Sequence, residues 1–338
     1  MASRAGAVTL ADVARAAGVS KMTVSRALSP DRSAALQPDT LARVRAAAGS
    51  LGYRPNLAAR SLTARRSGIV AIVVPDLGNA VFAEIIAGIQ AGLKDTGRET
   101  IVARTGFDPA AECDTVRHLS GWNPDAFVLA GPSRTDAVRA LVRDLGIPTV
   151  EVMDLPPDPI DMAVGFPHAE AGALAAEHLH ARGYRRPATL SCNAADTRAA
   201  RRIEGFRARA TGLGLAPPVD LFDPAEPSFG LGRALCARLR ARAPAVDCVF
   251  AANDLLAVGA VLHCQDAGVA VPGALAVCGF NDLPIAAEIG GGLTTVHSPR
   301  RAIGRETAAL LLDLAGGAAR PVAPVRHIPC HVVPRGTT

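Results

Sequence analysis

Three side chains in one short segment have the chemistry needed to read base pairs. On a helix, Lys21, Met22 and Arg26 point away from the face that carries Val24 and Leu28. Lysine and arginine donate hydrogen bonds to O6 and N7 of guanine, and a methionine side chain can contact the methyl group of thymine. We therefore expect the helix that begins at Lys21 to enter the major groove of DNA with its N-terminal end.

A second group, Arg198 and Arg202, has the chemistry to bind an anion. The two residues are four positions apart at the start of an expected helix, so they share one face. A helix N-terminus favours anions, and arginine binds carboxylates and phosphates with two parallel hydrogen bonds. The alternative is a surface stripe of arginines, because Arg201, Arg207 and Arg209 lie close by. We assign Arg202 to a pocket, and for Arg198 both interpretations stay open.

The base-reading side chains need a rigid helical frame. Thr9 and Asp12 have the spacing of a capping box, and the helix that they begin is expected to end at Gly18. Ser20 then caps a second helix, which extends to about residue 28. Two short helices joined by a tight turn form a helix-turn-helix. A third helix is expected over residues 38–51.

The charge of the chain is concentrated in this frame. Residues 1–66 contain eleven lysine or arginine residues and three aspartates, a net charge of +8, although the whole chain carries only +5. A basic head on a slightly acidic body indicates a module that binds a polyanion. The side chains expected to contact the DNA backbone are Thr9, Ser20, Thr23, Ser25, Tyr53 and Asn56.

From residue 67 onward the pattern changes to alternating apolar strands and amphipathic helices. Residues 69–74 form the first such strand, and a second set of strands and helices begins near residue 169. This alternation predicts α/β structure with parallel sheets covered on both faces, and two sets predict two lobes with a cleft at the strand C-termini. The fold class is therefore an all-α helix-turn-helix head followed by a two-lobed α/β core.

Enzymatic chemistry is not indicated. The chain contains no GxGxxG after its first strand, no Walker A motif, no GxSxG elbow and no HExxH. The seven cysteines are scattered and the eight histidines are dispersed, so we expect reduced thiols, no metal and no cofactor. No run of eighteen apolar residues occurs, and no apolar segment follows Arg4. We expect neither a membrane span nor a signal peptide, and a cytoplasmic, nucleoid-associated protein.

Two segments of the head closely resemble the lactose-repressor (LacI/GalR) family. They are Gly18-Val19-Ser20-Lys21-Met22-Thr23-Val24-Ser25-Arg26-Ala27-Leu28 and Leu51-Gly52-Tyr53-Arg54-Pro55-Asn56, the latter followed by Ala58-Ala59-Arg60-Ser61-Leu62. The resemblance implies a hinge helix over residues 56–66 that folds on operator DNA and enters the minor groove with Arg60 and Leu62. An apolar wedge of this kind unstacks a base step and kinks the duplex. The alternative for Leu62 is a packing residue at a domain junction.

The body resembles the effector-binding core of the same family, which looks like a periplasmic sugar-binding protein, so the resemblance extends over about residues 9–334. It implies a cleft lined by Phe82, Asp154, Arg202, Phe229, Asn253 and Asn281. Asn281 stands where most members have an aspartate that holds sugar hydroxyls. Pro167 and His168 replace an Asp-Asn pair that is common there, so no role is assigned to them.

Some stretches are more similar to the gluconate-operon repressors of this family. They are Ser120-Gly121-Trp122-Asn123-Pro124-Asp125, residues 150–154 with 160–166, and residues 253–260. Together with Arg198 and Arg202, this similarity favours a sugar acid such as gluconate, or its phosphate, as the effector. A neutral sugar or a purine stays open.

The domain organisation expected from these observations has three parts. Residues 1–55 form the helix-turn-helix domain, residues 56–66 the hinge, and residues 67–338 the core. Within the core we expect one lobe of about residues 67–166 with 293–320, and another of residues 167–292 with 321–338.

The predicted function is a homodimeric repressor that leaves a palindromic operator when its effector binds. A dimer follows because two heads match two half-sites. The alternatives are a soluble sugar-binding receptor without a role at DNA and an enzyme that uses the cleft. The operator, the sign of regulation, and dimer against tetramer are left open.

Overall fold

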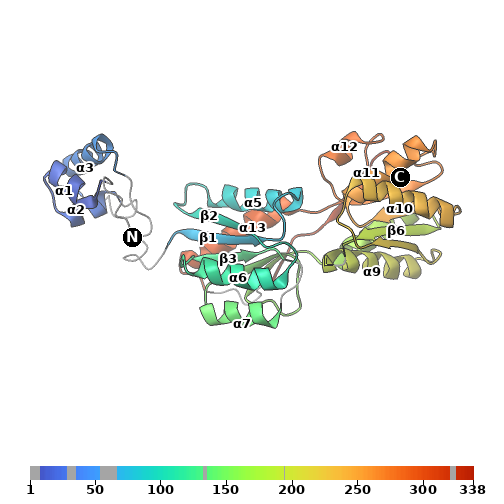
Figure 1. Ribbon diagram of the computed structural model, residues 1–338, viewed down its shortest axis with the longest axis horizontal. Helices are drawn as coiled ribbons and strands as arrows, with labels where there is room; N and C mark the ends of the chain where they lie inside the picture. Colours follow the sequence, from blue (N-terminus) through green and yellow to red (C-terminus); the bar gives the residue numbers. More distant parts are fainter. Residues whose placement is uncertain (1–7, 29–35, 54–66, 132–134, 194, 320–324) are drawn as a thin grey trace. The chain divides into compact units, whose positions relative to one another are not determined.

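The computed structural model describes residues 8–28, 36–53, 67–131, 135–193, 195–319 and 325–338 (Figure 1). The chain divides into two compact units, residues 1–67 and 68–338, which are called the head and the core below. Within the described part of the chain, no helix has both the length and the apolar character that crossing a membrane requires.

The head is a three-helix unit around a small apolar centre. Its helices are α1 (Leu10–Ala17), α2 (Lys21–Ala27) and α3 (Pro38–Ser50). The expected capping box is present: Thr9 Oγ1 accepts from the Asp12 amide at 3.3 Å, and the Asp12 carboxylate accepts from the Thr9 amide at 2.9 Å. Gly18 ends α1 with φ of 65°, a conformation that costs glycine little. The buried Val13, Val24 and Val44 then hold the three helices together.

The core contains two six-stranded sheets with the same strand order. The first runs β2-β1-β3-β4-β5-β11 and the second β7-β6-β8-β9-β10-β12. All pairings are parallel except that of β10 with β12. The strand bounds are β1 (Ile69–Val74), β2 (Glu99–Arg104), β3 (Ala126–Leu129), β4 (Thr149–Met153), β5 (Met162–Gly165), β6 (Pro187–Cys192), β7 (Val219–Asp223), β8 (Cys248–Ala251), β9 (Ala276–Asn281), β10 (Thr294–His297), β11 (Val325–His327) and β12 (His331–Val333).

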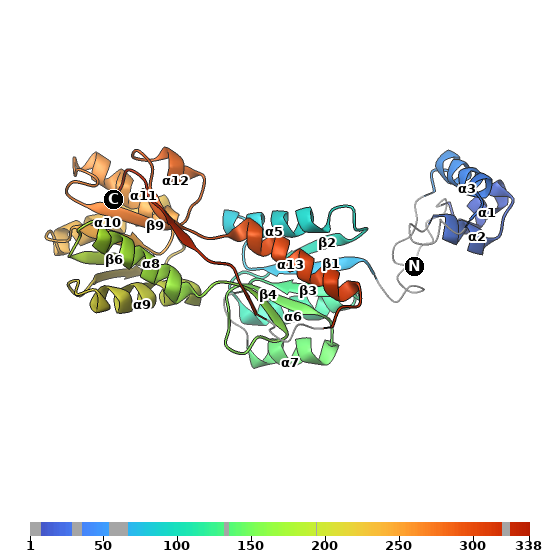
Figure 2. The ribbon, with the colours of Figure 1, turned by 180° about the vertical axis from the view of Figure 1, so that it is seen from behind.

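Helices cover both faces of each sheet, which explains why central strands such as β1, β3 and β8 are apolar along their whole length (Figures 1 and 2). In the first lobe, α5 and α13 cover one face and α6 and α7 the other. In the second lobe, α8 and α9 cover one face and α10 and α11 the other. The helix bounds are α5 (Ala80–Leu93), α6 (Pro109–Ser120), α7 (Asp136–Leu145), α8 (His168–Ala181), α9 (Thr197–Gly212), α10 (Phe229–Arg242), α11 (Asp254–Asp266), α12 (Ile285–Glu288) and α13 (Arg300–Ala315).

The two expected lobe boundaries near the C-terminus are wrong. β10 was expected in the first lobe, but it pairs with β9 of the second sheet. β11 was expected in the second lobe, but it pairs with β5 of the first sheet. The chain therefore passes between the lobes at residues 166–167, 298–299 and 328–330. The residue types of these short strands do not indicate which sheet they join, so only the pairing decides their membership.

Three helix pairs of the core approach each other closely enough to need glycine at the crossing. α5 meets α13 at Gly88 and Gly304, and α10 meets α11 in the same way. Between α8 and α9 the approach is closer still. A Cβ atom on Gly172 would lie 1.9 Å from the Arg202 carbonyl oxygen, and one on Gly205 would lie 2.0 Å from the Ala169 carbonyl oxygen. Because these obstructing atoms belong to the backbone, a side chain at either position would require the two helices to move apart.

This crossing generates a stability prediction with a control in the same helix. We expect Gly205→Ala to lower the free energy of unfolding of the core by at least about 1–3 kcal/mol, the usual cost of overpacking. Gly212→Ala, at the end of α9, has nothing within 4 Å of the new Cβ. It should leave stability unchanged or raise it by up to about 1 kcal/mol. Urea titrations of the three proteins measure both effects, and equal midpoints would contradict the close crossing.

Candidate functional site

The base-reading side chains proposed for the head lie on its surface. Lys21, Met22 and Arg26 are all exposed, and they flank the buried Val24 on α2. Met22 is 65 % exposed, which is high for a large apolar side chain. The fold therefore offers all three to solvent on the helix that was expected to carry them. Their contacts with bases stay predictions.

Several of the proposed DNA-backbone residues also hold the head together. Ser20 Oγ accepts from the Thr23 amide at 3.1 Å and lies 2.9 Å from Thr23 Oγ1, so both hydroxyls belong to the N-terminal cap of α2. Ser25 is exposed, whereas Tyr53 is half-buried against the head's apolar centre. Asn56, Arg60 and Leu62, with the rest of the expected hinge over residues 56–66, lie outside the described residues. Their roles stay predictions.

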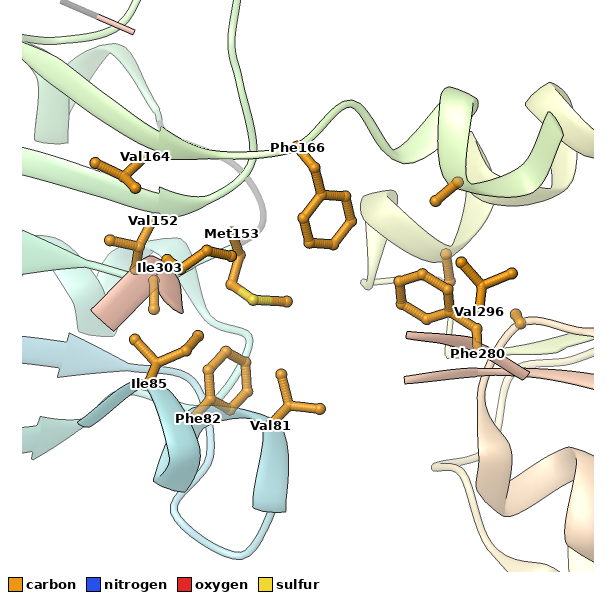
Figure 3. Packing of buried hydrophobic residues seen from close by; sticks show 14 of the residues in the cluster. Val81, Phe82, Ile85, Val152, Met153, Val164, Phe166, Phe280, Val296 and Ile303 are labelled. Atoms are coloured by element: carbon orange, nitrogen blue, oxygen red, sulfur yellow. The ribbon is translucent and has the colours of Figure 1, made fainter. Parts of the chain in front are cut away.

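The core contains a cavity between its lobes, at the carboxyl ends of the strands. It holds about 100 Å³. Figure 3 shows three of its apolar lining residues: Phe82 and Met153 from the first lobe and Phe280 from the second. The other lining residues are Asp76, Asn79, Val81, Phe107, His168, Cys192, Asn193, Asp196, Arg198, Ala199, Arg202, Glu226, Pro227, Asn253, Leu255, Asn281 and Leu283.

Two buried arginines supply the positive charge of the cavity, which the carboxylates of Asp76, Asp196 and Glu226 also line. Arg198 and Arg202 are 3 % and 4 % exposed, although both are long charged side chains. They rise from the first two turns of α9, and Asp196 caps this helix by accepting from the Arg198 amide at 3.2 Å. The Asp196 carboxylate lies 3.7 Å from Arg198 Nε and 3.8 Å from Arg202 Nη2. The pocket interpretation of this pair is therefore the one that the structure favours over a surface stripe.

The Arg202 guanidinium is held on several edges by groups without charge. Nε donates to the Ala252 carbonyl at 3.1 Å, and Nη1 donates to His168 Nδ1 at 2.8 Å. Its face lies over the Phe280 ring, with Cζ 4.2 Å from the ring centroid. Burial lowers the pKa of Arg202 to about 10, so the group still carries its charge at neutral pH.

His168, to which no role was assigned, is the partner that fixes Arg202. Its Nε2 lies 3.0 Å from the Met153 carbonyl oxygen, which only accepts, so Nε2 carries the proton. Nδ1 faces Arg202, which only donates, so Nδ1 carries none. Both bonds exist only in the neutral ring. Burial, followed by the charge of Arg202, holds the pKa of His168 well below its usual range.

Several other polar side chains line the cavity and are held by hydrogen bonds. Asn253 caps α11 through Oδ1, which accepts from the Leu256 amide at 3.0 Å. Asn281 Oδ1 accepts from Ser298 Oγ at 3.2 Å. Asn193 Nδ2 donates to Glu226 at 3.0 Å. The cavity is thus lined by two guanidinium groups together with carboxylate and amide side chains.

The structure brings together five of the seven proposed effector-binding residues. Phe82, Arg198, Arg202, Asn253 and Asn281 line the cavity.

Asp154 and Phe229 are not among the lining residues. The Asp154 carboxylate lies 2.5 Å from Arg201 and accepts from the Leu155 amide, so it bridges the lobes. Phe229 begins α10 and is 41 % exposed.

The polar groups of the site that sequence reasoning missed include Asp196, Glu226 and His168. Asp196 had a usable signal, because an aspartate directly before an expected helix is a typical N-cap. Glu226 and His168 had none of this kind. Their partners are distant in sequence, since His168 lies 34 residues from Arg202 and Glu226 lies 33 from Asn193.

A second, larger hollow of about 350 Å³ lies between α8 and the crossover at Pro329 and Cys330. Its two acidic side chains, Glu170 and Glu177, are 66 % and 45 % exposed. No buried charge faces it among its lining residues, so the interlobe cavity is the candidate site. Among the described residues, no group of three or more His, Cys, Asp or Glu side chains could hold a metal ion.

Comparison with known proteins places these observations in one family. Residues 9–56 match the family "Bacterial regulatory proteins, lacI family", and residues 67–333 match "Periplasmic binding proteins and sugar binding domain of LacI family". The chain is 41 % identical to the HTH-type transcriptional regulator GntR of Pseudomonas aeruginosa over 92 % of its own length and 90 % of that protein.

Solved structures agree with this placement. A LacI-family regulator from Silicibacter pomeroyi superposes with a TM-score of 0.87 at 32 % identity, over 98 % of this chain and 99 % of that one. The transcription regulator GntR from Chromobacterium violaceum superposes with a TM-score of 0.75, also at 32 % identity, over 80 % of this chain and 98 % of that one.

The buried neutral His168 generates a prediction for stability against pH. Its folded-state pKa lies below the ordinary 6.5, so the unfolded chain binds more protons at this residue. The stability that it contributes is present above about pH 6.5 and is lost as the pH falls through the folded-state pKa. We expect the unfolding free energy of the wild type to fall, relative to His168→Asn, by up to about 1.4 kcal/mol per pH unit in that range. Urea titrations between about pH 5 and 7.5 measure this difference, and parallel curves would contradict a buried neutral ring.

Proposed function

Because the chain belongs to the LacI family of bacterial regulatory proteins, and is thus a DNA-binding transcriptional regulator and not an enzyme, we propose that it is a repressor released from its operator by a sugar acid. The effector would be gluconate-like or a phosphate of such an acid. The protein would bind a palindromic operator as a homodimer, since two heads match two half-sites. The observation that carries the effector assignment is the pair of buried guanidinium groups at one end of the cavity.

The contacts of Arg202 support an anionic ligand. Nε and Nη1 are engaged by neutral acceptors, and Nη2 lies 3.8 Å from Asp196, which is too long for a hydrogen bond. A carboxylate of the effector placed within hydrogen-bond distance of Nη2 gains charge-assisted hydrogen bonds in a site of low dielectric. The Glu226 carboxylate and the amides of Asn193 and Asn253 would meet the hydroxyl groups of the same molecule.

The residues around the cavity supply a route from the effector to the lobes. Arg198 Nη2 donates to the Ala130 carbonyl of the first lobe at 3.1 Å, and Arg201 pairs with Asp154 of the first lobe. Helix α9 thus holds the first lobe through side chains beside the cavity. A ligand that draws Arg198 and Arg202 toward itself changes these bonds, and we propose that the resulting lobe movement separates the paired hinges on DNA.

A neutral-sugar effector is the second candidate. The lining carboxylates of Glu226 and Asp76 suit hydroxyl groups whether or not the ligand has a charge. A soluble receptor without a role at DNA is disfavoured, because the chain belongs to a family of bacterial regulatory proteins.

Calorimetry with D-gluconate, its 6-phosphate and D-glucose tests the effector class. We expect an acid to bind more tightly than glucose, and Arg202→Gln to weaken acid binding roughly 10- to 150-fold, the value of a hydrogen bond to a charged group. Arg207→Gln is the matched control, because Arg207 lies on the same helix and pairs with Asp220 on the surface. Binding of the neutral sugar alone would contradict the proposal.

The reading helix is tested by Arg26→Ala in a selection of binding sites from random DNA. A bidentate contact with guanine is worth about 1–3 kcal/mol, so the variant should bind the selected operator roughly 5- to 150-fold more weakly and lose preference at one base pair of each half-site. Arg15→Ala removes the same charge from α1, where Arg15 pairs with Asp12. This control should keep the preference, and an Arg26→Ala protein with an unchanged preference would show that another residue reads that base.

A further inference from the structure

We propose that His168 sets the charge class of the effector, because it orients Arg202 as a neutral acceptor and leaves the charge of the guanidinium to the ligand. This inference rests on the proposed function, since it concerns the same cavity. His168 is then a specificity-determining residue outside the set expected from the sequence, and the property that matters is the lack of charge on Nδ1.

The position of His168 gives it contact with both lobes. It is the first residue of α8, directly after the crossing from the first lobe at residues 166–167. Nε2 donates to Met153 at the end of β4, and Nδ1 accepts from Arg202 on α9. The ring therefore connects the strand end of one lobe to the anion-binding group of the other.

Packing leaves the ring little choice of orientation. Its centroid lies 4.6 Å from that of Phe166 and 6.2 Å from that of Phe280. Phe280 in turn lies beneath the Arg202 guanidinium, so the same aromatic ring packs against both partners of the hydrogen bond. His168 is 1 % exposed, and water does not compete for Nδ1.

The charge of the group at this position decides what Arg202 can offer a ligand. A carboxylate in place of the imidazole would form an ion pair with Arg202 at hydrogen-bond distance. The Asp196 carboxylate, by contrast, lies 3.8 Å from Arg202 Nη2. An anionic ligand would then meet a neutralised guanidinium and a repelling carboxylate in a poorly screened site. A neutral sugar would lose much less, because its hydroxyls do not depend on the net charge.

Three substitutions separate charge from hydrogen bonding at this position. His168→Asn keeps an acceptor near Nδ1 and loses the donor to Met153. His168→Gln keeps a donor near Nε2 and loses the acceptor for Arg202. His168→Asp keeps the acceptor and adds a negative charge. His178→Asn is the control, because His178 lies on the same helix and binds Thr338 at 2.8 Å, outside the cavity.

Calorimetry of the full chain with D-gluconate and D-glucose measures the ratio of their affinities. We expect His168→Asn and His178→Asn to keep most of the wild-type preference for gluconate. His168→Gln should weaken gluconate binding roughly tenfold or more, and His168→Asp should lower the gluconate-to-glucose affinity ratio by at least about tenfold. If His168→Asp does not fold, as judged by circular dichroism, the comparison of Gln with Asn still tests the acceptor.

The outcomes distinguish this inference from the proposed function. A wild type that shows no preference for gluconate over glucose contradicts the proposed function, and the charge role of His168 falls with it. A wild type that prefers gluconate, with His168→Asp retaining that preference, overturns the inference alone. Equal gluconate affinity in His168→Gln and His168→Asn overturns it as well, because orientation of Arg202 would then not depend on Nδ1.

Discussion

The backbone contact between α8 and α9 is the constraint on which the anion site depends. Gly172 and Gly205 let the two helices meet with no side chain between them. This approach brings His168, at the start of α8, within 2.8 Å of Arg202, three residues before Gly205 on α9. A hydrogen bond weakens within a few tenths of an ångström, so a single methyl group at the crossing is enough to break it. The geometry of the hydrogen bond between His168 and Arg202 therefore depends on two glycines, which have no side chain.

The energetics of the cavity favour function over stability. Burying a guanidinium costs free energy unless charged partners compensate, yet the bonded partners of Arg202 are the Ala252 carbonyl, a neutral imidazole and an aromatic face. The nearest carboxylate, that of Asp196, lies 3.8 Å from Nη2, beyond hydrogen-bond distance. The proposed anionic ligand would add a charged partner at closer range. The same logic explains a histidine that stays neutral beside two arginines.

Local patterns in the sequence were enough to predict the elements and much of the site. The strand at residues 69–74 and the capping box at Thr9 were predicted correctly, because apolar runs and cap spacing act over a few residues. The lobe memberships of β10 and β11 were not, since they depend on pairing between distant strands. His168 escaped prediction for the same reason. Its role exists only through Met153 and Arg202, and no spacing in the chain links the three.

The cavity also lies beside two of the three segments that join the lobes. Of the three segments that join the lobes, the first leads into His168, and the second contains Ser298, which donates to Asn281. Arg300 follows directly, donating to Ser298 Oγ at 2.8 Å and to Glu84 of α5 at 3.2 Å. The proposed ligand, bound to Arg202 and Asn281, would therefore act on the lobe connections themselves. Rigid lobes turn such a local pull into a rotation, and the first lobe begins with β1, directly after the segment expected to form the hinge.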